Sequence, residues 1–184
     1  MNFDNIAIET PRLILRPPVR DDFDAYAAIY SDNEVARFVG GVQTRAAAWR
    51  KFLTMAGAWH IQGFAMFAVI ERASGRHVGQ LGPWHPMDWP GTEVGWVMAR
   101  EFWGRGYACE GATAAIDWAF DHLGWSEVIH CIDPSNKASQ ALAQRLGSSM
   151  RGPVKMPAPY EDSPAEIWGQ TREQWRARRS ELAQ

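Results

Sequence analysis

Cysteine is scarce in this chain of 184 residues, which contains only Cys109 and Cys131. Two cysteines are too few for a disulfide framework or for a thiolate-based structural zinc site. No cluster of His, Cys and Asp has the spacing of metal ligands, so we predict no bound metal. The low cysteine usage suits a reducing compartment, and we expect cytoplasmic residence.

Long apolar runs and charge of one sign are also missing. The longest apolar run, Phe64–Ile70, is far shorter than the roughly 20 residues that cross a bilayer. The first ten residues include acids, so we expect no secretory signal. The 19 Lys and Arg offset 21 Asp and Glu, which gives a net charge of −2. We therefore expect neither nucleic acid nor a membrane surface as a partner.

What is present is an ordinary globular composition, with 46% apolar and 22% charged residues. The length suits a single domain over residues 1–184, and no repeat or long linker divides it. Apolar periodicity, caps and turn residues predict helices over about 22–30, 45–59, 107–123, 137–146 and 171–182. They predict strands over about 9–16, 64–71, 77–84, 92–98, 127–132, 148–152 and 165–170.

A glycine turn follows the strand Glu93–Met98 and leads directly into the helix that begins at Tyr107. Gly104 and Gly106 allow the backbone to approach a ligand without an intervening Cβ. The free N–H groups at a helix start, with the positive end of the helix dipole behind them, attract anions. The pattern therefore predicts a phosphate or pyrophosphate site.

A dinucleotide-binding oxidoreductase is one interpretation of this turn, since Asp133 ends the next strand where a ribose-binding acid would lie. Cys109 stands at the third glycine position of that fingerprint, and three antiparallel strands precede the motif. Both features disfavour a doubly wound fold. A P-loop is excluded because no Gly-Lys-Ser/Thr follows.

In this order of elements, the chain resembles the GNAT-superfamily N-acetyltransferases, in particular the branch of the ribosomal-protein N-terminal acetyltransferases. The resemblance lies in Thr10-Pro11-Arg12-Leu13-Ile14-Leu15-Arg16-Pro17, Glu93-Val94-Gly95-Trp96-Val97-Met98, Glu101 to Glu110, and Asn136-Lys137-Ala138-Ser139 with Leu146-Gly147. It implies an α+β fold with a mixed, mostly antiparallel central sheet and helices on both faces. One parallel pair would splay apart, between the strands that start near Thr92 and Glu127.

The resemblance also implies acetyl-CoA as the acetyl donor and a primary amine as the acceptor. The pantetheine arm would bond to the backbone of Val97 and Met98, with Asn136 and Ser139 as further contacts. The pyrophosphate would lie on the backbone of Trp103, Gly104, Arg105, Gly106, Tyr107 and Ala108.

Two catalytic candidates follow from the chemistry. A free amine is mostly protonated at neutral pH, so a base helps, and Glu93 is the candidate because family members often have a carboxylate there. The alternative to a catalytic role is that Glu93 is a carboxylate on the sheet surface, paired with a cation. Ser139 is the candidate donor to the thiolate, against a purely local hydrogen bond. Asn136 would cap a helix if it does not contact pantetheine. His130 and Cys131 are most simply core residues.

The chain departs from the family pattern at three positions: Ala143 replaces a Tyr that often serves as general acid, Gly111 replaces Ala, and Ser148 replaces an aromatic residue. A non-catalytic CoA- or peptide-binding member is therefore the alternative function. The acceptor is a protein N-terminus or a small-molecule amine, bound by residues within 39–62, 84–90 and 153–164. These segments hold few acids, which favours a mono-amine or a peptide end. A homodimer is left open.

Overall fold

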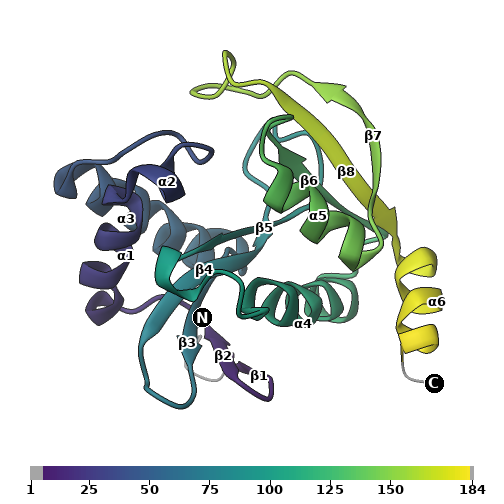
Figure 1. Cartoon of the computed structure of the whole chain (residues 1–184), viewed down its shortest axis with the longest axis horizontal. Coiled ribbons are helices and arrows are strands. Elements are labelled where there is room, and N and C mark those ends of the chain that lie inside the picture. The colour runs from purple at the N-terminus through teal and green to yellow at the C-terminus, as the bar shows by residue number, and fades with distance from the viewer. Residues whose placement is uncertain (1–5, 183–184) are drawn as a thin grey trace.

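The computed structural model describes residues 6–182 and contains one eight-stranded sheet in the order β1-β2-β3-β4-β5-β6-β8-β7 (Figure 1). All neighbouring strands are antiparallel except β5 and β6. This confirms the predicted mixed sheet with one parallel pair. The strands are β1 Ile8–Glu9, β2 Leu13–Arg16, β3 Phe67–Glu71, β4 His77–Trp84, β5 Glu93–Met98, β6 Glu127–Ile132, β7 Ser149–Val154 and β8 Ala165–Thr171.

Helices α3 and α5 have clear caps at their ends. The Thr44 hydroxyl accepts from the Ala47 N–H, and left-handed Gly63 and Gly147 terminate α3 and α5. The helices are α1 Phe23–Ser31, α2 Asn33–Ala36, α3 Arg45–Gln62, α4 Tyr107–His122, α5 Lys137–Leu146 and α6 Arg172–Leu182. None of the helices within residues 6–182 is long and apolar enough to cross a membrane.

Helices cover both faces of the sheet, and β5 contributes side chains to both cores. Val97 packs with the aromatic residues of α1 and α3, whereas Val94 and Met98 pack in the larger core beneath α4. This division follows from the alternation of side chains along a strand. Figure 1 shows α1, α2 and α3 on one side of the molecule and α4, α5 and α6 on the other.

The expected strand over 9–16 is instead two short strands joined by a tight turn. The Thr10 N–H donates to the Leu13 carbonyl and the Leu13 N–H donates to the Thr10 hydroxyl, each at 2.9 Å, so the chain reverses around Pro11. Proline also lacks the N–H that a continuous ladder would need. Two further boundaries differ: α2 is an unpredicted single turn capped by Asp32, and β3 begins at Phe67 rather than Phe64.

Candidate active site

The parallel strands β5 and β6 remain paired over a very short length. Their register contains a single Cα pair, Glu93 with Ile129, supported by the bond from the Ile129 N–H to the Thr92 carbonyl at 2.9 Å. Beyond this point β6 continues with β8 and β7, away from β5 (Figure 1). The predicted splayed pair is therefore confirmed.

The peptide groups of β5 alternate between the two neighbouring strands. The Ala99 N–H bonds to Val78 in β4, whereas the Val94 carbonyl accepts from His130 in β6. By alternation, the peptide groups of Trp96 and Met98 face β6. The Val97 carbonyl faces β4, where a Cβ on Gly79 would lie 2.5 Å from it.

Of the two β5 residues predicted to bind pantetheine, only Met98 thus directs its backbone toward the splay. Its carbonyl accepts a hydrogen bond from Trp103 Nε1 at 2.8 Å, and the Trp103 side chain is half exposed. The indole therefore links the end of β5 to the glycine turn. Backbone contact between pantetheine and these residues stays a prediction.

Glu93 lies at the last paired position before the strands diverge and is only 6% exposed. Its Oε1 accepts from the Cys131 N–H at 3.1 Å, and its Oε2 accepts from Trp89 Nε1 at 2.6 Å. Burial raises the pKa of Glu93 to about 7, although both hydrogen bonds act in the opposite direction. No cation pairs with Glu93 in the described part of the chain, so the sheet-surface ion pair is excluded. A carboxyl that titrates near neutral pH can act as a general base.

The start of α5 brings Asn136 and Ser139 together on the other side of the splay. Asn136 caps the helix by accepting from the Ser139 N–H at 3.1 Å. The Ser139 hydroxyl accepts from Trp96 Nε1 at 3.2 Å, which leaves its own proton available to another acceptor. Asn136 is therefore the N-cap of α5, as the alternative to pantetheine binding predicted, and the capping bond uses its Oδ1.

Ala143 is fully buried in a cluster with Ile132 and Trp168, and Trp96 packs against that cluster. The indole of Trp96 also lies 4.7 Å from the His130 ring. The aromatic side chain next to α5 is thus supplied by Trp96 of β5 and not by position 143 of the helix itself.

The glycine turn has the backbone conformation expected of an anion site. Gly104 and Gly106 have φ values of +74° and +80°, and no atom lies within 4 Å of a Cβ built on Gly104. In the described part of the chain, the N–H groups of Gly104, Arg105 and Gly106 have no hydrogen-bond acceptor. The first N–H groups of α4, from Tyr107 and Ala108, have no acceptor within the helix. The turn can therefore donate several hydrogen bonds to one anion.

The three segments predicted to bind the acceptor meet near Glu93. A Cβ on Gly40 would lie 3.3 Å from the Tyr160 ring, and Tyr160 in turn packs edge-on against Trp89 at 6.1 Å. Trp89 donates directly to Glu93. The pKa of Tyr160 is raised by burial and by the nearby Glu93 carboxylate. The buried Tyr26 hydroxyl of α1 also lies near Tyr160 and next to Tyr30.

His130 is a core residue. Its Nδ1 bonds to the Val94 carbonyl at 2.7 Å, which requires a proton on Nδ1, and its Nε2 then accepts from the Ser148 hydroxyl at 3.0 Å. Ser148 also accepts from Gln170 Nε2 at 3.1 Å. Burial lowers the pKa of His130 to about 4, so the ring stays neutral. Ser148 replaces the usual aromatic residue because it completes this buried network.

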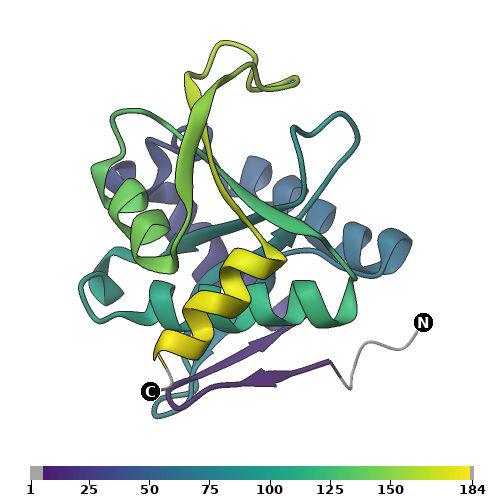
Figure 2. The ribbon, with the colours of Figure 1, turned by 90° about the vertical axis from the view of Figure 1, so that its right-hand side faces the viewer.

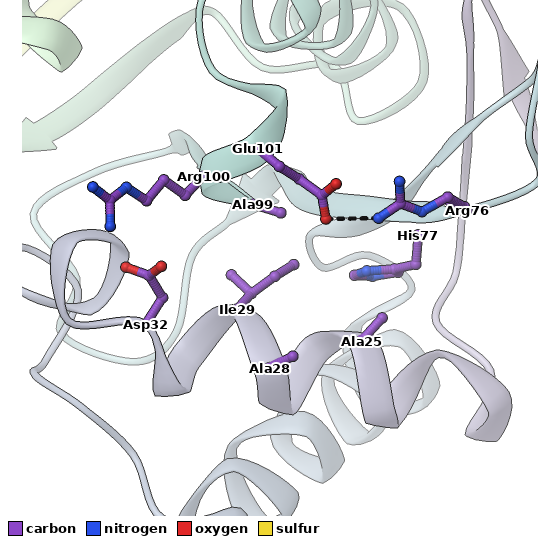
Figure 3. Close-up of a pocket in the computed structure, with 9 residues that line it drawn as sticks. All are labelled: Ala25, Ala28, Ile29, Asp32, Arg76, His77, Ala99, Arg100 and Glu101. Carbon is purple, nitrogen blue, oxygen red and sulfur yellow. Dashed lines mark hydrogen bonds and ion pairs between the residues drawn. The ribbon is translucent and has the colours of Figure 1, made fainter.

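A surface cavity of about 770 Å³ lies between α1 and the ends of β4 and β5 (Figure 3). Its lining includes His77, Arg100 and the Arg76–Glu101 ion pair, whose atoms are 2.6 Å apart. Neither Glu93 nor the glycine turn lines it, so this cavity is separate from the candidate site. Among residues 6–182, no group of three or more His, Cys, Asp and Glu could hold a metal ion.

Comparison with known proteins agrees with this geometry. Residues 12–149 match the family model of the acetyltransferase (GNAT) domain, so the chain belongs to the GNAT acetyltransferases. It is 26% identical to an uncharacterized N-acetyltransferase of Bacillus subtilis, YoaA, over 80% of this chain and 85% of the relative.

Solved structures show the same fold. An acetyltransferase from Agrobacterium tumefaciens superposes with a TM-score of 0.80 at 29% identity, covering 94% of this chain and 98% of its own. The ribosomal-protein-S5-alanine acetyltransferase of Vibrio fischeri gives 0.72 at 17% identity, covering 93% and 99%. The second similarity is one of fold. An oxidoreductase is excluded by the family and the fold together.

Sequence reasoning missed the residues that act through tertiary contacts. Trp89 and the Cys131 N–H hold the Glu93 carboxylate, and Trp96 orients Ser139. The signal available in the sequence is its ten tryptophans, but their number fits packing in the core as well as lining of a binding cleft. Trp89, in the β4–β5 connection, is a near neighbour of Glu93 in the sequence, whereas Cys131 reaches the carboxylate only through the pairing of β6 with β5.

Proposed function

We propose that this acetyltransferase is a single domain that moves an acetyl group from acetyl-CoA to a primary amine, in a complex that holds both substrates. The observation that carries the proposal is Glu93: a buried carboxyl with a pKa raised to about 7, at the point where β5 and β6 diverge. The free N–H groups of residues 104–108 and the positive φ angles of Gly104 and Gly106 fit the pyrophosphate of the donor.

The residues have separate roles in the proposed reaction. Acetyl-CoA supplies an acetyl group that is already activated as a thioester. Glu93 takes the proton from the attacking amine, directly or through a water molecule. The Met98 N–H, which faces the splay, donates to the acetyl carbonyl oxygen, and the Ser139 hydroxyl donates to the departing sulfur. A thiol is a tolerable leaving group, so a strong acid such as the missing Tyr is not required.

The acceptor is proposed to be a mono-amine or a peptide N-terminus, bound where Gly40, Trp89 and Tyr160 meet. Trp89 and Tyr160 lie beside Glu93 there, and Lys51 of α3 donates to the Val39 carbonyl next to Gly40, which adds positive rather than negative charge. Burial lowers the pKa of Lys51 to about 8, and its ammonium lies 4.4 Å from the Tyr30 ring. A polycationic amine would find little charge complementarity at such a site.

The test begins with thermal-shift titrations of acetyl-CoA, CoA and NADH, followed by an amine panel assayed for thiol release. A ligand that binds the native state raises the melting temperature by mass action. We expect shifts with acetyl-CoA and CoA, none with NADH, and thiol release with at least one mono-amine or peptide. Glu93→Gln is expected to bind CoA normally and to lose turnover, whereas Glu127→Gln, on an exposed ion pair, retains it. CoA binding without turnover on any amine would favour the non-catalytic alternative.

A further inference from the structure

The segment Thr10–Arg12 resembles the family pattern but lies away from Glu93. It forms the turn between β1 and β2 and contacts the first turn of α4 through Glu110. Figure 2 shows the β1–β2 hairpin beside α4. The segment therefore bears on the glycine turn and not on the acceptor side of the sheet.

Glu110 accepts three hydrogen bonds from this segment. Its Oε1 accepts from the Thr10 hydroxyl at 2.6 Å and from the Arg12 N–H at 2.8 Å, and its Oε2 accepts from Arg12 Nε at 2.6 Å. The Glu110 side chain is only 15% exposed. Bonds from both the backbone and the guanidinium hold Arg12 in one orientation.

The other side of the Arg12 guanidinium holds the glycine turn. Nη1 donates to the Arg105 carbonyl at 2.8 Å, the guanidinium stacks over the Tyr107 ring at 4.7 Å, and a Cβ on Gly106 would lie 3.4 Å from Nη2. In a trans peptide the carbonyl and the following N–H point in opposite directions. Arg12, by binding the Arg105 carbonyl, thus turns the Gly106 N–H away from itself.

We propose that Arg12, held by Glu110, is a positioning residue that fixes the Arg105–Gly106 peptide so that its N–H donates to the pyrophosphate of CoA. This inference rests on the proposed function for its ligand. Arg12 acts here through geometry: its Nε bonds to Glu110 and its Nη1 to the Arg105 carbonyl, and the two bonds together fix the orientation of that peptide group. The Thr10-Pro11-Arg12 motif then has a purpose: it supports the phosphate-binding turn from outside.

The direction in which Glu110→Gln changes CoA affinity distinguishes a positioning role of the Arg12–Glu110 pair from a purely electrostatic one. Glu110→Gln removes a negative charge near the phosphate site, so charge alone predicts tighter CoA binding. If Arg12 held by Glu110, which we call the anchor, positions the turn, Glu110→Gln weakens CoA binding, because an amide cannot accept all three hydrogen bonds. Arg12→Lys keeps the charge and loses the fork that joins Glu110 to Arg105.

The experiment is calorimetric titration of CoA and pantetheine into wild type, Glu110→Gln and Arg12→Lys, with melting temperatures recorded. Arg151→Gln is the matched control, since its ion pair with Glu127, at 2.5 Å, is close in length to the 2.6 Å pair of Arg12 with Glu110 and lies elsewhere, between β6 and β7. We expect each anchor variant to weaken CoA binding about ten-fold. Pantetheine, which has no pyrophosphate, should bind as it does to wild type, and the control should match wild type for both ligands.

The proposed positioning role would be overturned if Glu110→Gln bound CoA as tightly as wild type or more tightly. It would also be overturned if Arg12→Lys had the CoA affinity of wild type. An equal loss for CoA and pantetheine would also overturn it, because that result indicates a general structural role. A wild-type protein that binds no CoA would instead overturn the donor assignment, and the anchor with it.

Discussion

The Glu93 carboxyl is buried, accepts hydrogen bonds from two donors, and has no cationic partner among residues 6–182. Trp89 and the Cys131 N–H stabilise the ionised form, yet burial outweighs them and the pKa rises to about 7 from its ordinary value of 4.5. Folding therefore favours the protonated carboxyl. The stability that Glu93 contributes is fully present below pH 4.5 and is lost as the pH rises to about 7.

We accordingly expect the Glu93→Gln variant to gain stability relative to the wild-type protein as the pH rises. The free energy of unfolding of the variant relative to wild type should increase between pH 5 and pH 8, by up to about 3 kcal/mol. Urea unfolding at several pH values measures it, with Glu127→Gln as the control. A difference that does not vary with pH would contradict a raised pKa.

Ser139 has its oxygen engaged by Trp96 and its proton free. Ser139→Ala is expected to lower kcat by roughly ten-fold, less than the loss of a full general acid, because a thiol leaves readily. Steady-state kinetics with the amine found in the screen measures this, with Ser180→Ala in α6 as the control. An unchanged kcat would show that Ser139 is only a local hydrogen-bonding residue.

At the scale of elements, two helical glycines look alike in the sequence and differ in their surroundings. Gly57 in α3 has no atom within 4 Å of a built Cβ, whereas a Cβ on Gly111 in α4 would lie 2.6 Å from Leu81 and 3.5 Å from Leu13. Leu81 and Leu13 are fully buried and cannot move away freely. The glycine at position 111 lets α4 approach the sheet.

Gly57→Ala should therefore stabilise the protein by about 0.5–1 kcal/mol, through helix propensity and reduced unfolded-state entropy. Gly111→Ala should destabilise it by about 1–3 kcal/mol through overpacking. Denaturant unfolding of the two variants measures both, and each serves as the control for the other. Stabilisation by both substitutions would mean that α4 can shift at little cost.

At the scale of the whole molecule, three distant segments converge on one carboxylate. Gly40, Trp89 and Tyr160 come from three separate connections of the fold, and Tyr160 contacts the other two. The proposed acceptor site is therefore built from other segments than the glycine turn that is proposed to bind the donor. Each substrate should therefore respond to its own set of substitutions.

Tyr160→Ala is expected to raise KM for the amine by about ten-fold, through lost aromatic packing, and to leave KM for acetyl-CoA unchanged. Two-substrate kinetics measures both constants. Met87→Ala is a suitable control, because Met87 is 88% exposed in the same connection as Trp89. An equal effect on both substrates would contradict the assignment of Tyr160 to the acceptor.

The sequence by itself determined the order of elements, the parallel pair, the glycine turn and the family, and it indicated Glu93 as a candidate. These features depend on local patterns: strand alternation, helix periodicity, and glycines where backbone must approach a ligand. Only the tertiary structure decided the hairpin at Pro11, the burial of Glu93, and its donors Trp89 and Cys131. It also brought Trp96 to Ser139 and Arg12 to the Arg105 carbonyl. The contacts of Cys131, Trp96 and Arg12 join residues that are far apart in the sequence, so they depend on how the whole chain packs. The Pro11 turn and the Trp89–Glu93 bond are local, but the local pattern does not specify the loop conformation that forms them.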